Sequence, residues 1–143
     1  MRLWHKDLIE VLPRQQLLGQ WRECCLIAKN ISKKGTPNHI LVNKIMNYQI
    51  NHFIYYSKLI YSEMIIRGYK CDKNKFTKYI SCAHHNYPKY EELFMDWHND
   101  RYLLQCYLNL QEKFDCNGIT KEEFSSIRKR VYDVLYTGEQ KWI

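Results

Sequence analysis

The chain has 143 residues, of which 45% are hydrophobic and 15% aromatic, enough for one folded domain over residues 1–143 and too many for a disordered chain. Lys and Arg outnumber Asp and Glu by 22 to 15, a net charge of +7. This balance favours a polyanionic partner, usually nucleic acid, although many small basic proteins bind none. No apolar stretch approaches the roughly 20 residues that span a bilayer, and the charged N-terminus lacks a signal peptide's apolar centre. We therefore expect a cytoplasmic protein with no membrane contact.

Apolar residues recur at helical spacing in the first half of the chain. The first helix is expected from Pro13, a residue favoured at helix starts, to about Lys29. The Gly-, Ser- and Lys-containing segment Ile31–Pro37 is interpreted as a loop. A short helix over His39–Met46 and a longer one over Ile50–Arg67 follow, with Gly68 as the stop signal of the longer helix.

The second half of the chain continues the helical pattern after an irregular aromatic and basic stretch over residues 73–90. A helix fits Asp100 to Lys113, and a last helix begins at Thr120, whose spacing to Glu123 makes a capping box, and ends before Gly138. No alternating pattern bounded by turn residues indicates a sheet. The predicted fold is all-α, a compact single-domain bundle of several helices.

The six cysteines are expected to be free thiols, because the cytoplasm keeps thiols reduced and the sequence has no CxxC pair. His84 and His85 after Cys82 could suggest zinc, but no second ligand pair has suitable spacing. We expect no metal and no cofactor.

The segment Gln15–Glu23 holds the strongest candidate site. With 3.6 residues per turn, Gln16, Gln20 and Glu23 share one stripe of the first helix, and Arg22 lies beside it. Such a stripe can hold a phosphate and a developing cation. Solvated surface charge is the alternative interpretation of the same residues.

The chain resembles the pyrimidine-dimer DNA glycosylase family, the endonuclease V type best known from a bacteriophage. The resemblance is carried most clearly by Gln15, Leu17, Arg22 and Glu23, which lie at nearly the family's distance from the N-terminus. Weaker agreement follows at Lys58–Met64, at Arg67–Tyr69 and over His98–Lys113. The opening from Met1 to Gln20 looks like the cellular branch of the family. The resemblance covers about residues 1–113 and is strongest over residues 1–25.

The resemblance implies a DNA repair glycosylase with linked AP lyase activity on damaged duplex DNA, with pyrimidine dimers as the expected lesion. The N-terminal α-amine would attack the sugar C1′, form a Schiff base and allow β-elimination. An α-amine has a pKa of about 7.7–8.0, so part of it is nucleophilic at neutral pH. Because Arg2 is too bulky for ordinary removal of the initiator Met, the expected nucleophile is the amine of Met1. Glu23 would stabilise the oxocarbenium-like transition state and shuttle protons.

The expected partner is damaged double-stranded DNA, bound by a monomer. Arg22 would hold the phosphate next to the lesion through a bidentate pair. The full set of expected DNA contacts is Arg2, Arg14, Gln15, Gln16, Arg22, Lys29, Lys33, Lys34 and His98. The family's C-terminal aromatic cluster has no clear counterpart here, and Tyr132, Tyr136 and Trp142 are candidates by composition alone.

Two other functions remain open at this point. A non-catalytic nucleic-acid-binding helical domain would keep the basic surface but would not need a free N-terminus near Glu23. An interaction protein built on a helical bundle would show no salt-dependent affinity for DNA. The stretch Lys70–Tyr90 interleaves lysines with aromatic residues, which suits phosphate contacts with base stacking as well as it suits a solvated loop.

Overall fold

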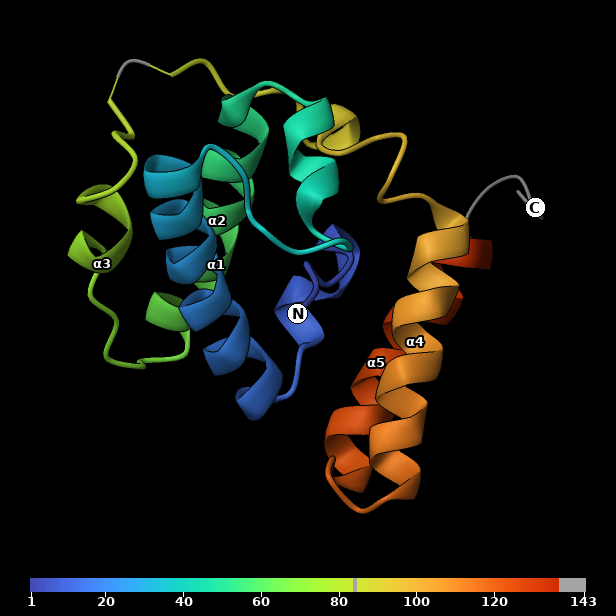
Figure 1. Cartoon of the computed structure of the whole chain (residues 1–143). Helices are drawn as coiled ribbons and strands as arrows, with labels where there is room; N and C mark the ends of the chain where they lie inside the picture. Colours follow the sequence, from blue (N-terminus) through green and yellow to red (C-terminus); the bar gives the residue numbers. More distant parts are fainter. Residues whose placement is uncertain (84, 137–143) are drawn as a thin grey trace.

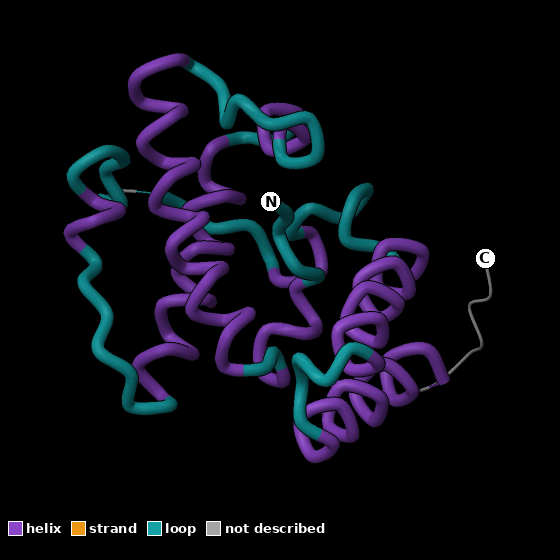
Figure 2. Tube along the Cα trace, turned by 60° about the horizontal axis from the view of Figure 1, so that its bottom comes forward, coloured by secondary structure: helices purple, strands orange, loops and turns teal. Residues whose placement is uncertain are grey.

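The computed structural model describes residues 1–83 and 85–136, and this part of the chain is helical throughout its regular structure, without a strand (Figures 1 and 2). In chain order the elements are η1 (Lys6–Val11), α1 (Arg14–Lys34), η2 (Asn43–Asn47), α2 (Ile50–Ile66), α3 (Asn74–Thr77), η3 (Tyr90–Glu92), α4 (Asp100–Asp115) and α5 (Lys121–Tyr136). The all-α prediction is confirmed. No helix in the described ranges is long and apolar enough to cross a membrane.

Helix α1 begins beside Pro13, as predicted, but extends five residues beyond the expected end at Lys29. The predicted loop over Ile31–Pro37 is therefore wrong for its first four residues. Nothing before Gly35 breaks the helix, and Gly35 ends it with a left-handed φ of 77° and an N–H that donates to the Ile31 carbonyl at 2.9 Å. Lys33 and Lys34 lie in the last turn, where their positive charges interact favourably with the negative end of the helix dipole.

Helices α1 and α2 lie side by side and supply much of the core (Figure 1). Helix α2 occupies the predicted range to within one residue and buries Phe53, Tyr56 and Ile60. The short helix expected over His39–Met46 is instead the 3₁₀-helix η2, which begins at Asn43. Among the described residues of the irregular stretch 73–90, only the four-residue helix α3 and the start of η3 are regular.

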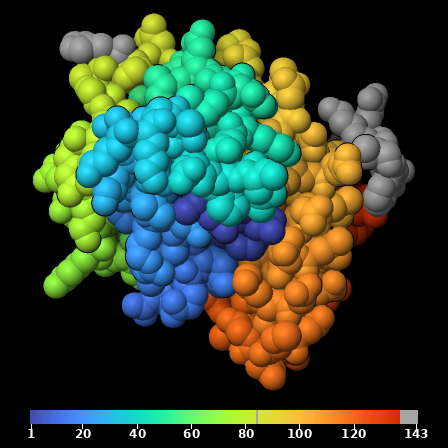
Figure 3. Space-filling model, viewed as in Figure 1, coloured from blue at the N-terminus to red at the C-terminus, as the bar shows by residue number. Residues whose placement is uncertain are grey.

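The first twelve residues form an internal segment between the α1–α2 pair and the α4–α5 hairpin (Figure 1). Leu3 and Leu8 are 0% exposed, and the 3₁₀-helix η1 packs on both α2 and α5. The helix η1 was not predicted from the sequence. In Figure 3 part of these first residues (dark blue) nevertheless reaches the surface, between α1 and α4. The start of the chain is thus held by the core and still open to a ligand.

Helices α4 and α5 pack against each other as a hairpin. Asn99 caps α4 by accepting a hydrogen bond from the Tyr102 N–H at 3.0 Å. The capping box predicted at Thr120 is confirmed: Thr120 N–H donates to Glu123 Oε1 at 3.0 Å, and Glu123 N–H donates to Thr120 Oγ1 at 3.1 Å. The predicted end of this helix before Gly138 lies outside the described residues.

Candidate active site

Gln20 ties the start of the chain to α1. Its side chain is on the buried face of α1, and the residue is 1% exposed. The Trp4 N–H donates to Gln20 Oε1 at 2.7 Å, and Gln20 Nε2 donates to the Arg2 carbonyl at 2.9 Å. One amide therefore satisfies two backbone groups of the N-terminal segment, which fixes this segment along the helix.

The same amide reaches the predicted acid–base residue. Gln20 Nε2 also lies 3.4 Å from Glu23 Oε2, one helical turn further along α1. Glu23 is half-buried, and Met1, which precedes Arg2, is half-buried against the core. The structure thus brings the Glu23 carboxylate and the beginning of the chain to the same amide group.

Two tyrosines from distant parts of the chain complete this attachment. Tyr56 OH donates to the Trp4 carbonyl at 2.6 Å and contacts Gln20 Oε1 at 3.1 Å, while Tyr102 OH donates to the Leu3 carbonyl at 2.8 Å. Burial raises the pKa of both phenols, so they remain neutral donors. Neither tyrosine was predicted from the sequence, and Gln20 was placed on the candidate stripe without a role of its own. For Gln20 the shared stripe with Glu23 was an available signal.

His98 lies inside the protein, with 4% of its surface exposed. Its Nδ1 accepts a hydrogen bond from the Lys6 N–H at 3.0 Å, and its ring stacks on His5 with 5.2 Å between centroids. Burial lowers the pKa of His98 well below 6.5 and that of His5 to about 4, so both rings are neutral at pH 7. In this arrangement His98 holds the N-terminal segment, and the DNA contact expected of it stays a prediction that would act through this segment.

Arg22 is exposed on α1, and it makes no hydrogen bond or ion pair with any described residue. Its Nη2 folds over Gly19, 3.8 Å from the position that a Cβ would occupy there. The side chain is therefore available for a phosphate. Gln16 is half-buried, and its Oε1 lacks a hydrogen-bond partner in the described ranges.

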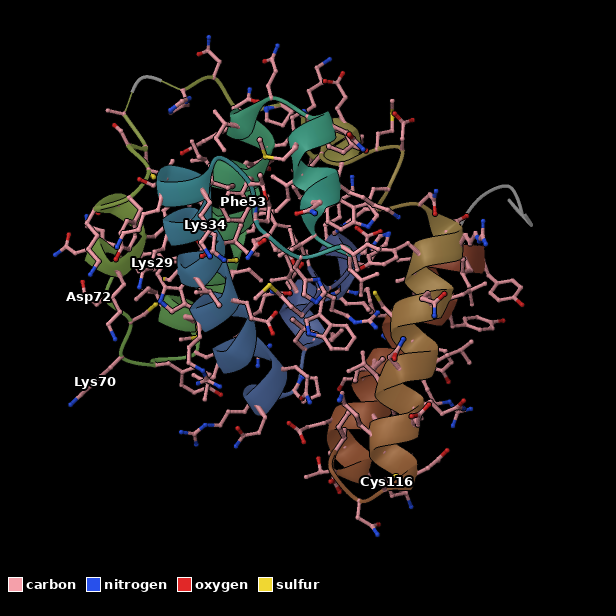
Figure 4. All side chains as sticks on the ribbon, in the orientation of Figure 1. Lys29, Lys34, Phe53, Lys70, Asp72 and Cys116 are labelled. Atoms are coloured by element: carbon pink, nitrogen blue, oxygen red, sulfur yellow. The ribbon has the colours of Figure 1, made fainter. Side chains whose placement is uncertain are left out.

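The other predicted DNA contacts on α1 are spread along the helix. Arg14 and Gln15 are exposed in its first turn, where the Arg14 guanidinium lies over the Tyr69 ring at 5.3 Å. Lys29, Lys33 and Lys34 are exposed in its last two turns, and Lys29 and Lys34 are labelled in Figure 4. A helix of this length spans about 30 Å. These cations are distributed along the length of α1 rather than gathered in one compact site.

A cleft of about 470 Å³ opens beside the N-terminal segment. Arg2 and Tyr102 form the side of the cleft that is nearest to this segment. Arg2 also lies over the Trp4 ring at 5.2 Å. The cleft is lined by Arg2, Leu41, Lys44, Asp96, Trp97, Asn99, Arg101, Tyr102 and Gln105. The lining contains three cationic side chains and one carboxylate, so the charge of the cleft favours binding of an anion.

The cysteines are free among the described residues, as expected. Burial raises the pKa of Cys24 and brings that of Cys25 to about 11, so neither is a thiolate near neutral pH. No group of three His, Cys, Asp or Glu residues in the described ranges could hold a metal ion. His84 lies outside these ranges.

A comparison with protein-family models matches residues 1–77 to the family of pyrimidine dimer DNA glycosylases. The matched region includes η1, α1, η2, α2 and α3, and with them Gln20, Glu23 and the whole N-terminal segment. No curated protein and no solved structure matches the chain. Because the matched region covers more than half of the residues and contains the candidate site, the chain belongs to the pyrimidine dimer DNA glycosylase family.

Proposed function

We propose that the chain is a DNA glycosylase with linked AP lyase activity, and that the α-amine of Met1 is its nucleophile. The observation that carries the proposal is the contact of one Gln20 amide with both the Arg2 carbonyl and the Glu23 carboxylate. Family membership supports DNA as the substrate and pyrimidine dimers as the lesion.

In the proposed reaction the Met1 nitrogen forms a bond with C1′, and the bond from C1′ to the base breaks. The electron pair of that bond leaves with the base. Loss of the ring oxygen from C1′ then gives an imine between Met1 and the opened sugar. Removal of a proton from C2′ expels the 3′ phosphate and breaks the strand. In this proposal the Glu23 carboxylate stabilises positive charge at C1′ and accepts and returns protons.

Borohydride trapping tests the nucleophile directly, because only an imine is reduced to a permanent protein–DNA bond. The protein must begin at its native Met1, and the substrates are duplexes that contain an abasic site or a pyrimidine dimer. We expect a trapped complex with the native start and none after acetylation of the N-terminus. Trapping that survives acetylation would transfer the nucleophile to a lysine and overturn the proposal.

Glu23→Gln tests the carboxylate while keeping the size of the side chain. We expect base release to slow by at least 100-fold, because removal of one preorganised electrostatic group typically costs that much. Affinity for the damaged duplex should change less than threefold. Glu122→Gln, an exposed carboxylate on α5, is the matched control. If the native protein binds the duplex but neither releases base nor forms a trapped complex, the chain is a non-catalytic DNA-binding member of its family.

A further inference from the structure

An exposed apolar turn, residues 39–42, lies beside the start of the chain. Ile40 is 84% exposed, more than any other large apolar side chain that the structure describes, and the adjacent Leu41 is 47% exposed. Leu41 lines the same cleft as Arg2. In Figure 3 the teal surface of this region borders the dark blue surface of the first residues. Two apolar side chains are therefore open to solvent next to the N-terminal segment.

The turn is fixed by its own hydrogen bonds and by the core. The N–H groups of Val42 and Asn43 both donate to the His39 carbonyl, at 3.2 and 2.8 Å, and the His39 N–H donates to Asn43 Oδ1 at 3.1 Å. Val42 and Ile45 anchor the turn from below, at 0% and 1% exposure. A segment that is already ordered loses little conformational freedom when it binds. The turn can therefore press its two exposed side chains against a ligand at low entropic cost.

Positive charge lies close to this apolar turn. Three cations, Arg2, Lys44 and Arg101, line the cleft beside it. The last turn of α1, which carries Lys33 and Lys34, ends shortly before it. An apolar tip among cations fits a partner that is anionic on its outside and apolar inside. Duplex DNA is built in this way, because its phosphates flank a stack of bases.

The proposed nucleophile has little freedom to move toward its target. Leu3 is 0% exposed, Gln20 Nε2 holds the Arg2 carbonyl at 2.9 Å, and Tyr102 OH holds the Leu3 carbonyl at 2.8 Å. Met1 alone precedes this anchored stretch. In an intact duplex C1′ is covered by the stacked bases and the backbone that it joins. The DNA must therefore open at the lesion before the amine can reach C1′.

We propose that Ile40, supported by Leu41, is a wedge that enters the base stack beside the lesion and holds that step open for the Met1 amine. Apolar side chains of this kind separate neighbouring base pairs and kink the duplex. Lys44 and Arg101 would then neutralise phosphates of the kinked strand. The purpose of the wedge rests on the proposed function, but its contact with the bases does not.

The fluorescence of 2-aminopurine tests the wedge, because this base becomes brighter when it loses a stacked neighbour. The full chain is mixed with a duplex that carries 2-aminopurine beside a tetrahydrofuran abasic site, which cannot form an imine. We expect the native protein to raise the fluorescence about threefold, Ile40→Ala to lose most of this rise, and Ile40→Leu to keep it. Ile66→Ala, which removes a 77% exposed isoleucine from the last residue of α2, is the matched control and should behave as the native protein does.

Single-turnover cleavage of a duplex with a natural abasic site gives a second measurement. At saturating protein Ile40→Ala should cleave roughly tenfold more slowly than the native protein, because it loses most of the apolar surface of the wedge. On a duplex with mismatched pairs beside the lesion the step is already unstacked, so the variant should recover most of its rate. An equal loss of rate on both duplexes would contradict the wedge.

The proposal is overturned if the native protein does not raise the fluorescence, or if Ile40→Ala raises it as much as Ile66→Ala does. Vesicles of phosphatidylcholine and phosphatidylserine distinguish the other anionic surface with an apolar interior. If Ile40→Ala weakens vesicle binding and leaves the fluorescence unchanged, the turn binds a membrane surface and the proposal is wrong. The fluorescence measurement needs no imine, so a protein that opens the step but gives no borohydride-trapped complex would refute the lyase and leave the wedge intact.

Discussion

Gln20 makes four polar contacts from a position that is 1% exposed, with Trp4, Arg2, Glu23 and Tyr56. A buried amide is stable only when its donors and acceptors are satisfied. Here the groups that satisfy it belong to the N-terminal segment and to the carboxylate proposed for acid–base catalysis. One side chain therefore couples the stability of this region to the geometry of the proposed reaction.

Gln20→Leu should lower the single-turnover rate of trapping at least tenfold while affinity for the duplex changes less than threefold. The reason is that leucine releases the Arg2 carbonyl and leaves the Trp4 N–H buried without a partner. The free energy of unfolding should fall by about 2 kcal/mol. Gln49→Leu, an exposed glutamine before α2, should change neither quantity. An equal loss of rate and of affinity in Gln20→Leu would contradict a positioning role.

The lowered pKa values of the buried His5 and His98 lead us to expect that the stability of the fold depends on pH. Burial holds the pKa of His5 at about 4 and that of His98 well below the ordinary 6.5. The unfolded chain therefore binds more protons than the folded chain between pH 6.5 and 4, and stability falls as the pH falls through this window. The stability that comes from the two neutral histidines is fully present above pH 6.5. For His5 alone the loss is on the order of 3 kcal/mol by pH 4.

Urea unfolding at pH 7.5, 6.5, 5.5 and 4.5 measures this dependence. His98→Asn keeps an acceptor for the Lys6 N–H and removes one titrating ring, so its stability should fall less steeply with pH than that of the native protein. Equal slopes for the two proteins would show that His98 does not contribute.

At the scale of elements, α5 is joined to the start of α1 through its capping box. Glu123 Oε1 accepts from the Thr120 N–H, and Glu123 Oε2 accepts from the Arg14 N–H at 3.2 Å. Arg130 on α5 donates to the Asp7 carbonyl of η1 at 2.9 Å. The C-terminal helix is thus attached at two places to the segments that carry the candidate site.

Thr120→Ala and Glu123→Ala distinguish the contribution of the N-cap to stability from that of the attachment to α1. Thr120→Ala should lower the free energy of unfolding by about 1 kcal/mol, the usual cost of losing an N-cap side chain. Glu123→Ala should cost more, because it removes the acceptors of the Thr120 N–H and of the Arg14 N–H together. Glu122→Ala, which lies next to it in the first turn, is the control for charge and helix propensity. Urea unfolding of the three variants gives the order, and a smaller loss for Glu123→Ala than for Thr120→Ala would contradict the attachment.

Local patterns predicted the long helices well, because helix boundaries depend on neighbouring residues. The start of α1 beside Pro13, the extent of α2 and the capping box of α5 are of this kind. The loop expected from Ile31 was wrong because Lys and Ser tolerate a helix, and Gly35 alone ends it. The helix η1 was missed because one short turn carries too few residues to show a period.

The candidate site was predictable only in its local part. Glu23 and Gln20 share a stripe because they are three residues apart, which the sequence displays directly. Tyr56 and Tyr102 meet Trp4 and Leu3 across 52 and 99 residues, and nothing in their own neighbourhoods indicates such contacts. The burial of His98 depends on the same long-range packing.

At the scale of the whole molecule, the N-terminal segment depends on residues beyond the family match. Lys6 Nζ donates to the Tyr90 and Leu93 carbonyls at 2.7 and 2.8 Å, and Tyr102 and Arg130 hold the Leu3 and Asp7 carbonyls. These partners all lie after residue 77, where the match ends. The region that defines the family therefore receives its placement partly from η3, α4 and α5.

The net charge of +7 and the cations distributed along α1 predict that binding to duplex DNA depends on salt concentration. Each phosphate neutralised by a Lys or Arg releases counterions, so the logarithm of affinity falls linearly with that of salt concentration, by about 0.9 per contact. If Lys33 and Lys34 both contact phosphates, the double substitution to Gln should reduce this slope by about 2 and weaken binding to damaged and undamaged duplexes alike.

The matched control is the pair Lys113→Gln and Lys121→Gln, which removes the same charge from the two sides of the α4–α5 turn. Figure 4 shows that this turn, marked by Cys116, lies at the other end of the molecule from Lys34. Fluorescence anisotropy between 50 and 200 mM salt gives the three slopes, and we expect the control to keep that of the native protein. If both pairs reduce the slope equally, the effect comes from net charge and not from contacts along α1. If the Lys33 and Lys34 substitutions reduce the slope more than the control substitutions do, this end of α1 contacts the DNA backbone, because the net charge is the same in both variants.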